Sequence, residues 1–168
     1  MKKNISLFVL KYIRFFGRLQ LVKVRFLQKT KGKSLEIVGI TGSAGKSSTL
    51  LACQSIFPKN IRVKTNNGCN SESGLPLSLL DLKIDSYNLI SWIKIVFLAP
   101  VKYLINWQRY DVLILEMGID AIGWPKNMDY LLSIVKPNIG IFLNVSPVHL
   151  MNFGSLDQIA KEKAKLVN

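Results

Sequence analysis

The chain has 168 residues, of which 49% are hydrophobic and 20% are charged, and this composition excludes a disordered protein. Its length corresponds to about one domain. The formal net charge is +13, but residues 1–33 hold ten Lys or Arg and no acidic residue, which leaves 13 basic and ten acidic residues for positions 34–168. Because the main part of the chain is nearly balanced, we expect no nucleic acid partner.

Residues 1–33 are predicted to form a basic amphipathic helix that precedes the main domain. Leu7, Leu10, Ile13 and Phe16 recur at helical intervals among the cations, and basic residues interrupt every apolar run well before the roughly 18 residues of a membrane span. Two roles fit this pattern: contact with an anionic membrane surface, and packing on the domain behind it. Two cysteines without metal-ligand spacing indicate a cytoplasmic location, and membrane contact would place the chain at the inner face of the membrane.

Residues 34–168 are predicted to form an α/β domain, a three-layer and mostly parallel sheet flanked by helices. Short apolar runs indicate strands at 35–40, 61–65, 111–118 and 138–145. Helices are predicted at 46–57, about 75–107, 127–135 and from 156 onward. Within the longest of these stretches, Lys94, Pro100 and Lys102 interrupt an apolar run, which favours a buried or partly covered helix pair over 89–107.

The segment VGITGSAGKSSTL, residues 38–50, is typical of a strand that enters a glycine-rich turn and then a helix. Such a turn directs backbone N–H groups and the positive end of the helix toward phosphate oxygens. Lys46 would then contact the β- and γ-phosphates, and the Ser47 hydroxyl would bind Mg²⁺. The first glycine of the general G-x-x-x-x-G-K-[ST] pattern falls on Ile40. We interpret the segment as a nucleotide site, the alternative being a glycine turn with a solvated lysine.

The loop resembles the variant phosphate loop of the Mur ligase family, which joins amino acids or peptides to a muramoyl peptide at the expense of ATP. Three further segments are similar to that family in the same order: NSESGLPLSLL at 70–80, VLILEMGID at 112–120, and the strand, His-Leu and lysine helix of 136–167. The resemblance covers about residues 35–168 and favours the branch that adds D-alanyl-D-alanine. It implies that ATP is bound by Thr41, Gly42, Ser43, Ala44, Gly45, Lys46, Ser47 and Ser48.

Three residues outside the loop are expected to be catalytic together with Lys46. Glu116 ends an apolar strand, where a parallel sheet delivers side chains to a ligand, and it would hold Mg²⁺ with Ser47. The resemblance implies that His149, the only histidine, approaches a second Mg²⁺, although its spacing alone favours a structural residue. It also implies that Lys163 becomes carbamylated; the alternative is a solvated basic face of its helix.

The asparagine-rich segment is the expected substrate side of the site. Asn70 and Ser71 are predicted to bind substrate. The family often shows paired asparagines at this place, whereas here Asn70 is followed by serine, and Asn66 and Asn67 stand upstream.

The resemblance implies amide formation from a muramoyl peptide and an amino acid or dipeptide, with ATP and Mg²⁺ as cofactors. A substrate carboxylate would attack the γ-phosphate to give an acyl phosphate, which an amine then displaces. Complete ligases of this type also have a UDP-sugar-binding N-terminal domain and a C-terminal domain, so we expect an incomplete central ATPase domain that needs a further C-terminal domain or chain. Two alternatives remain: a nucleotide-binding scaffold without catalysis at the membrane, and an unrelated P-loop kinase of small substrates.

Overall fold

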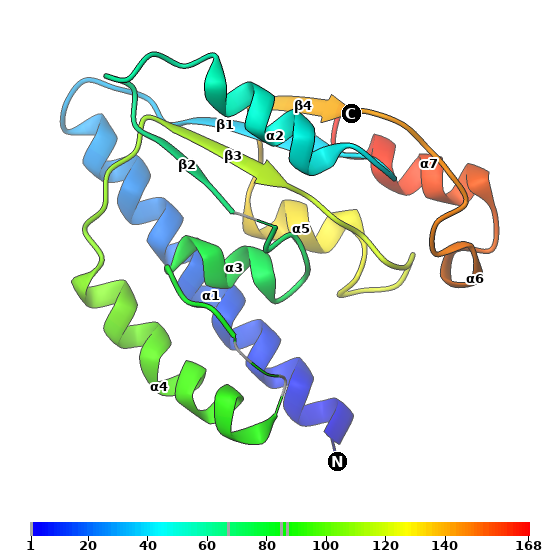
Figure 1. Cartoon of the computed structure of the whole chain (residues 1–168). Coiled ribbons are helices and arrows are strands. Elements are labelled where there is room, and N and C mark those ends of the chain that lie inside the picture. Colours follow the sequence, from blue (N-terminus) through cyan, green and yellow to red (C-terminus); the bar gives the residue numbers. More distant parts are fainter. Residues whose placement is uncertain (1, 67, 85, 87) are drawn as a thin grey trace.

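The computed structural model describes residues 2–66, 68–84, 86 and 88–168, with side chains described from residue 7 onward. It is an α/β structure, as predicted (Figure 1). In chain order, the elements are α1 (Lys2–Lys29), β1 (Glu36–Thr41), α2 (Lys46–Ser55), β2 (Val63–Thr65), α3 (Gly74–Leu79), α4 (Leu89–Ile105), β3 (Val112–Glu116), α5 (Met128–Ile134), β4 (Ile139–Phe142), α6 (Leu150–Phe153) and α7 (Leu156–Ala164).

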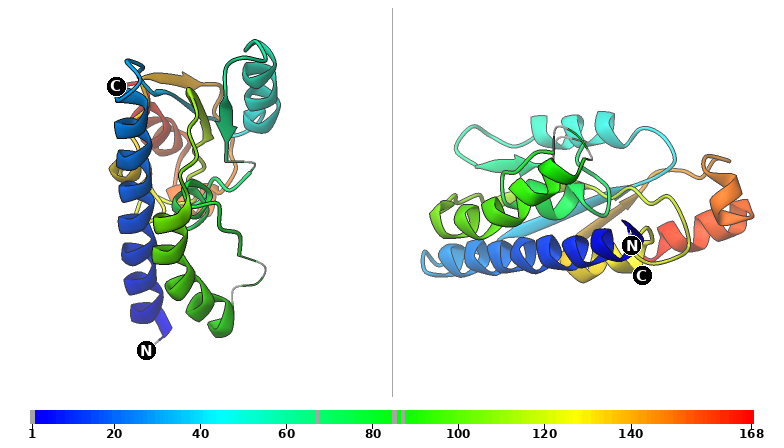
Figure 2. Two further views of the ribbon diagram at one scale, coloured as in Figure 1. Left: turned by 90° about the vertical axis from the view of Figure 1, so that its left-hand side faces the viewer. Right: turned by 90° about the horizontal axis from the view of Figure 1, so that it is seen from below.

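The four strands form one parallel sheet in the order β2-β3-β1-β4. Helix α2 covers one face of the sheet, and α1, α3 and α5 lie on the other, which confirms the predicted three layers (Figures 1 and 2). The two central strands are in register with Ile40 of β1 opposite Glu116 of β3. Their carboxyl ends therefore meet at the same edge of the sheet, where open α/β sheets bind ligands.

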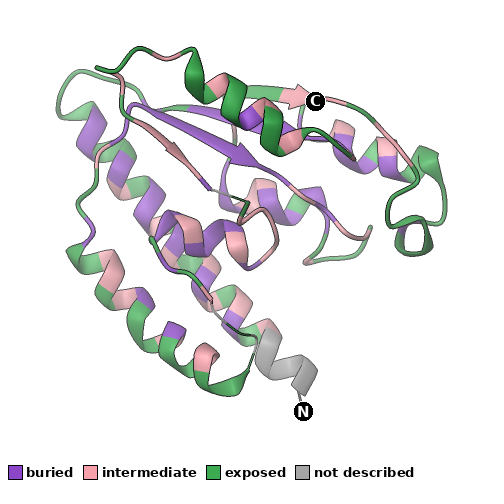
Figure 3. Cartoon of the chain, viewed as in Figure 1, coloured by how far each residue is buried: buried purple, intermediate pink, exposed green. Residues whose placement is uncertain are grey.

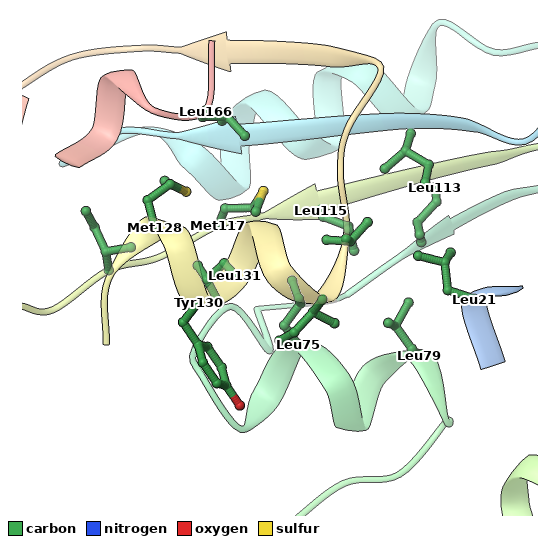
Figure 4. Close-up of a cluster of buried hydrophobic side chains, with 14 of the residues drawn as sticks. Leu21, Leu75, Leu79, Leu113, Leu115, Met117, Met128, Tyr130, Leu131 and Leu166 are labelled. Carbon is green, nitrogen blue, oxygen red and sulfur yellow. The ribbon is translucent and has the colours of Figure 1, made fainter. Parts of the chain in front are cut away.

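Alternate side chains of the central strands fill two separate cores. Leu113 and Leu115 of β3 belong to the larger cluster, together with residues from α1, α3, α5 and α7 (Figure 4). Val112 and Ile114 face the smaller cluster, which contains Leu50 of α2. Because side chains alternate between the faces of a strand, Glu116 at the end of β3 lies on the α2 side.

Helix α1 packs on the domain through the apolar face recognised in the sequence. Ile13 and Val24 are fully buried, and a side chain at Gly17 would bring its Cβ within 2.9 Å of the Pro76 Cβ in α3. The face that contains Ile13 is therefore occupied by the domain, and it is not available to a membrane. No helix within the described part of the chain is long and apolar enough to cross a membrane.

The predicted helix pair at 89–107 is wrong, because a single helix, α4, spans this stretch with Pro100 inside it. Proline lacks the N–H that would bond to the carbonyl four residues earlier, here Val96. The Tyr12 hydroxyl of α1 donates a hydrogen bond to that same carbonyl at 3.0 Å. A donor from a neighbouring helix thus replaces the one that the proline removes, which explains why α4 continues.

We expect Tyr12→Phe to lower the free energy of unfolding by about 1–3 kcal/mol, because it leaves the Val96 carbonyl without this donor. In a Pro100→Ala background, Tyr12→Phe should lower the free energy of unfolding by less, since the alanine N–H supplies the missing hydrogen bond to the Val96 carbonyl. Urea denaturation of the four proteins of this double-mutant cycle measures the coupling. An equal cost of Tyr12→Phe in both backgrounds would contradict this explanation.

Candidate nucleotide site

The glycine-rich turn lies at the carboxyl end of β1 and leads directly into α2. Gly45 precedes the first helical residue with a left-handed backbone, φ 82°, a conformation that glycine adopts without steric cost. The first N–H groups of a helix have no acceptor within the helix, so the start of α2 offers donors to an anion. Lys46, Ser47 and Ser48 form this first turn, and the two serines are exposed.

The turn is held in shape by a residue that the sequence analysis missed. Asn144 accepts hydrogen bonds through Oδ1 from the backbone N–H groups of Ser43 and Ala44, at 3.1 and 3.0 Å, and its Nδ2 donates to the Ala44 carbonyl at 3.1 Å. The Ser43 hydroxyl also accepts a bond from the Ser146 N–H at 2.9 Å. The segment after β4 therefore braces the outer half of the turn and leaves the α2 end to a ligand.

Two lysines converge on one carbonyl oxygen of the turn. Lys46 Nζ donates to the Gly42 oxygen at 2.8 Å, and Lys163 Nζ, from α7, donates to the same oxygen at 3.1 Å. The Lys163 residue is buried, with 4% of its surface exposed. It is therefore not part of the solvated basic face that was the alternative interpretation of α7.

The surroundings of Lys163 favour its neutral form. Burial, and to a smaller extent the positive charge of Lys46, lower the pKa of this lysine to about 8, while Asp120 acts in the opposite direction. The folded structure thus holds a primary amine that is partly unprotonated near neutral pH. Such an amine is a nucleophile, whereas an ordinary surface lysine is almost entirely protonated.

Glu116 is buried beside the turn, and asparagine side chains form hydrogen bonds with both its backbone and its carboxylate. Asn70 Nδ2 donates to Glu116 Oε2 at 3.3 Å. Asn66 bonds to the backbone on both sides of the same residue, because its Oδ1 accepts from the Glu116 N–H at 3.0 Å and its Nδ2 donates to the Glu116 carbonyl at 2.8 Å. The carboxylate is thereby fixed in position, with 3% of the residue exposed.

His149 lines the pocket beside the turn and belongs to the segment after β4. It has a left-handed backbone, φ 56°, immediately before α6, and its Nε2 lies 3.5 Å from Oδ1 of Asp120. Both side chains are about half exposed. A pocket of about 260 Å³ is lined by Gly42, Ser43, Lys46, Asn70, Gly118, Ile119, Asp120, Val148, His149 and Lys163.

Two other predicted residues have structural partners. The Thr41 hydroxyl is buried and donates to the Met117 carbonyl at 2.9 Å, which ties β1 to the end of β3. The Ser71 hydroxyl accepts a bond from the Gly74 N–H at 3.2 Å, at the start of α3. Asn67 lies outside the described residues.

The three residues that sequence reasoning missed have a common signal. Asn66, Asp120 and Asn144 each follow the carboxyl end of a strand, β2, β3 and β4 respectively. Polar side chains at these positions of a parallel sheet reach the ligand crevice. A search for polar residues at or just after the carboxyl end of each predicted strand would have found them.

The available donors fit Mg²⁺ better than a metal that requires a complete protein cage. Among the described residues, no group of three or more His, Cys, Asp or Glu side chains is placed to hold a metal. Mg²⁺ is usually bound by one or two carboxylates, with water and substrate phosphates completing its shell. Glu116 and the Ser47 hydroxyl are hard oxygen donors of this kind.

We expect the Lys163 amine to titrate with a midpoint near pH 8, because of its burial and the charge of Lys46. NMR of the lysine side-chain amines, assigned with Lys163→Arg, measures it. Lys46→Met should raise the midpoint, whereas Lys161→Met, at an exposed position, should not. Because the unfolded chain keeps this proton to higher pH, the free energy of unfolding should also rise as the pH increases above about 8. If Lys46→Met left the titration midpoint of Lys163 unchanged, the electrostatic effect of Lys46 on Lys163 would be contradicted.

Comparison with known sequences agrees with this geometry. The family model described as the Mur ligase middle domain matches residues 40–168. A UDP-N-acetylmuramoyl-tripeptide--D-alanyl-D-alanine ligase from Borreliella burgdorferi is 32% identical over 150 residues, which are 89% of this chain and 26% of that protein. The ligase of the same name from Mycobacterium tuberculosis is 35% identical over 133 residues, 79% of this chain and 21% of that protein. The chain thus spans about a quarter of the length of these relatives.

Solved structures show the same fold. A MurF ligase from Thermotoga maritima, in complex with ADP, matches with a TM-score of 0.64 at 24% identity and covers 94% of this chain and 29% of that one. A MurF structure from Acinetobacter baumannii matches with a TM-score of 0.63 at 24% identity and covers 91% of this chain and 27% of that one. Because the family model matches most of this chain, residues 40–168, the chain belongs to the Mur ligase family and contains a middle domain of that family.

Proposed function

We propose that this chain carries the nucleotide site of an ATP-dependent peptide ligase of peptidoglycan precursor synthesis. The observation that supports this most is the arrangement around one pocket: the glycine turn and Lys46 on one side, Asn70 beside Glu116 on another, and His149, Asp120 and Lys163 completing the lining. Lysines and an acidic side chain around one pocket suit a polyphosphate that arrives with its metal.

In this proposal the loop binds the phosphates of ATP. The N–H groups at the start of α2 contact phosphate oxygens, and Lys46 turns from the Gly42 carbonyl toward the β- and γ-phosphates. Mg²⁺, held by Ser47 and Glu116, would neutralise part of the charge on those phosphates. Asn70 and Asn66 keep the Glu116 carboxylate oriented for this role. His149 would contact a second Mg²⁺.

The chemical step is the activation of a carboxylate. An oxygen of the substrate carboxylate attacks the γ-phosphorus, the bond from that phosphorus to the bridging oxygen breaks, and ADP leaves with the electron pair. An amine then attacks the acyl carbon of the acyl phosphate, inorganic phosphate leaves, and the nitrogen loses a proton. Lys46 favours the first step because it places positive charge where oxygen charge accumulates.

Lys163 would act as a carbamate in this scheme. Its unprotonated amine forms an N–C bond to CO₂ and releases a proton, which converts a cation into an anionic oxygen donor. The lowered pKa of Lys163 supports this step, since only the neutral amine reacts. The modification would also remove the repulsion between Lys163 and Lys46 and would supply a ligand facing the second Mg²⁺.

We propose a muramoyl tripeptide as the acyl substrate and D-alanyl-D-alanine as the amine. The names of the two relatives above support this choice. Asn70 lines the pocket and would face the substrate side, with Ser71 next to it. A cytoplasmic location is part of the proposal, because ATP and soluble precursors are available there.

We expect Lys46→Ala to weaken ATP binding by about 10- to 100-fold, because a charge-assisted contact to phosphate is lost. Isothermal titration of the 168-residue chain with MgATP measures the affinity. The control is Lys161→Ala, which removes an exposed lysine outside the pocket. Unchanged ATP affinity in Lys46→Ala would count against the site.

When the further C-terminal domain or chain that this domain is expected to need is supplied, the ligase reaction predicts release of phosphate from ATP that depends on a UDP-muramoyl tripeptide. It also predicts an amide product when D-alanyl-D-alanine is present. Glu116→Gln should reduce this release at least about tenfold, since the metal loses a charged donor, while circular dichroism shows an intact fold. Phosphate assays and mass spectrometry follow both products. A stable phosphorylated substrate would instead indicate a kinase, and nucleotide binding with no turnover would favour the scaffold alternative.

A further inference from the structure

The outward side of α4 is an apolar surface that the domain leaves uncovered. Only Ile95 and Ala99 of this helix are buried. Ile90, Ile93, Phe97, Val101 and Leu104 are exposed at helical spacing, and Phe97 exposes 71% of its surface. Figure 3 shows most of this helix as exposed. Apolar residues concentrated in this way on one helix face indicate a contact with another phase or partner.

Helix α1 extends the same surface. Phe8, Phe15, Val22 and Phe26 are exposed on its outward side, opposite the face that packs on the domain. The two helices lie side by side in both views of Figure 2. Aromatic rings link them, because Phe16 lies 5.3 Å from Phe15 and 6.1 Å from Tyr103 of α4 between ring centroids. We call these exposed apolar side chains of α1 and α4 the α1–α4 surface.

The charges on the two helices that form this surface have one sign. Neither helix contains an acidic residue, while α1 has eight Lys or Arg and α4 has two lysines. On the exposed side of α1, Lys11, Arg18 and Arg25 alternate along the helix with the apolar residues. A groove of about 550 Å³ combines both kinds, lined by Lys11, Arg14, Phe15, Arg18, Leu19 and Val22.

We propose that the α1–α4 surface docks on an anionic lipid bilayer. Its apolar side chains would enter the boundary between headgroups and acyl chains, and the α1 cations would contact lipid phosphates. Trp107, just beyond α4, exposes 63% of its surface and lies 4.8 Å from Lys23 Nζ, an amphipathic pair suited to that boundary. The helices would lie on the bilayer without crossing it.

The charge pattern favours lipid over a second copy of the chain and over nucleic acid. Two copies of the chain meeting through this surface would bring only cations together, with no acidic partner on either helix. Nucleic acid would satisfy the cations but would leave the aliphatic and aromatic side chains of α4 facing a polar backbone. A bilayer with anionic headgroups provides negative charge and an apolar phase at the same boundary.

This inference is independent of the proposed function. No residue of α1 or α4 lines the nucleotide pocket. The face described here is also different from the one predicted in the sequence, since Ile13 is buried and the newly assigned residues lie on the opposite side of α1. Lipid binding and nucleotide binding are therefore separable in experiment.

Sedimentation of the full 168-residue chain with vesicles tests the proposal. We expect binding to vesicles of phosphatidylcholine with phosphatidylglycerol, several-fold weaker binding in high salt, and little binding to phosphatidylcholine alone. The triple variant Ile93→Ser, Phe97→Ser, Val101→Ser should lose about tenfold or more in vesicle affinity. The double variant Lys11→Gln, Arg18→Gln should remove much of the salt-sensitive part of the vesicle binding.

The matched control is Leu51→Ser with Ile56→Ser, which changes two exposed apolar residues at α2, on the other face of the sheet. It should leave vesicle binding unchanged, and Lys46→Ala should do the same. Circular dichroism and ATP affinity of the triple variant verify that it folds. Equal binding to neutral and anionic vesicles, or equal losses in the α2 control, would overturn the proposal. The proposal would also be overturned if the unmodified chain bound no vesicles but formed a dimer in solution that the triple variant abolished.

Discussion

The parallel pairing of β1 with β3 is the constraint on which the site depends. With Ile40 opposite Glu116, the chain leaves β1 for the glycine turn at the level where β3 presents its carboxylate. A shift of one residue would turn Glu116 toward the other core, where leucine and methionine side chains are packed. The register between these two buried strands therefore determines whether Glu116 and the phosphate loop lie on the same side of the sheet.

The site also contains an electrostatic conflict that an anion resolves. Lys46 and Lys163 share the Gly42 carbonyl, a neutral group, although both lysines carry positive charge when protonated. The conflict is tolerated because the lysines belong to elements that are fixed by packing, α2 and α7. Residues held in an unfavourable arrangement by the surrounding fold are typical of functional sites. In the proposed function, a triphosphate would supply the negative charge that this part of the pocket lacks.

The sequence predicted the local features of this protein better than its long-range ones. The phosphate loop was recognisable because its residues are contiguous, and the strands because buried parallel strands are continuous apolar runs. Asn144 was not recognisable as part of the loop, since it is about 100 residues away in the chain and meets Ser43 only through the pairing of β4 with β1.

The helix at 89–105 illustrates the same limit. Proline inside a helical pattern usually indicates a break, and here the donor that compensates for it comes from Tyr12, 84 residues earlier. For the same reason, the sequence identified α1 as amphipathic but not which of its sides faces the domain. Phe15 and Phe16 are adjacent in sequence, yet only Phe15 is exposed on the outer side. Such contacts between distant segments cannot be read from periodicity.

The hydrogen bonds of Asn144 have a mechanical consequence for the pocket. Asn144 and His149 belong to the same short stretch after β4, and Asn144 is bonded to three backbone groups of the turn. A ligand that displaces the turn must therefore also move the segment bearing the imidazole. Asn144 thus connects the phosphate turn directly to the segment that carries His149.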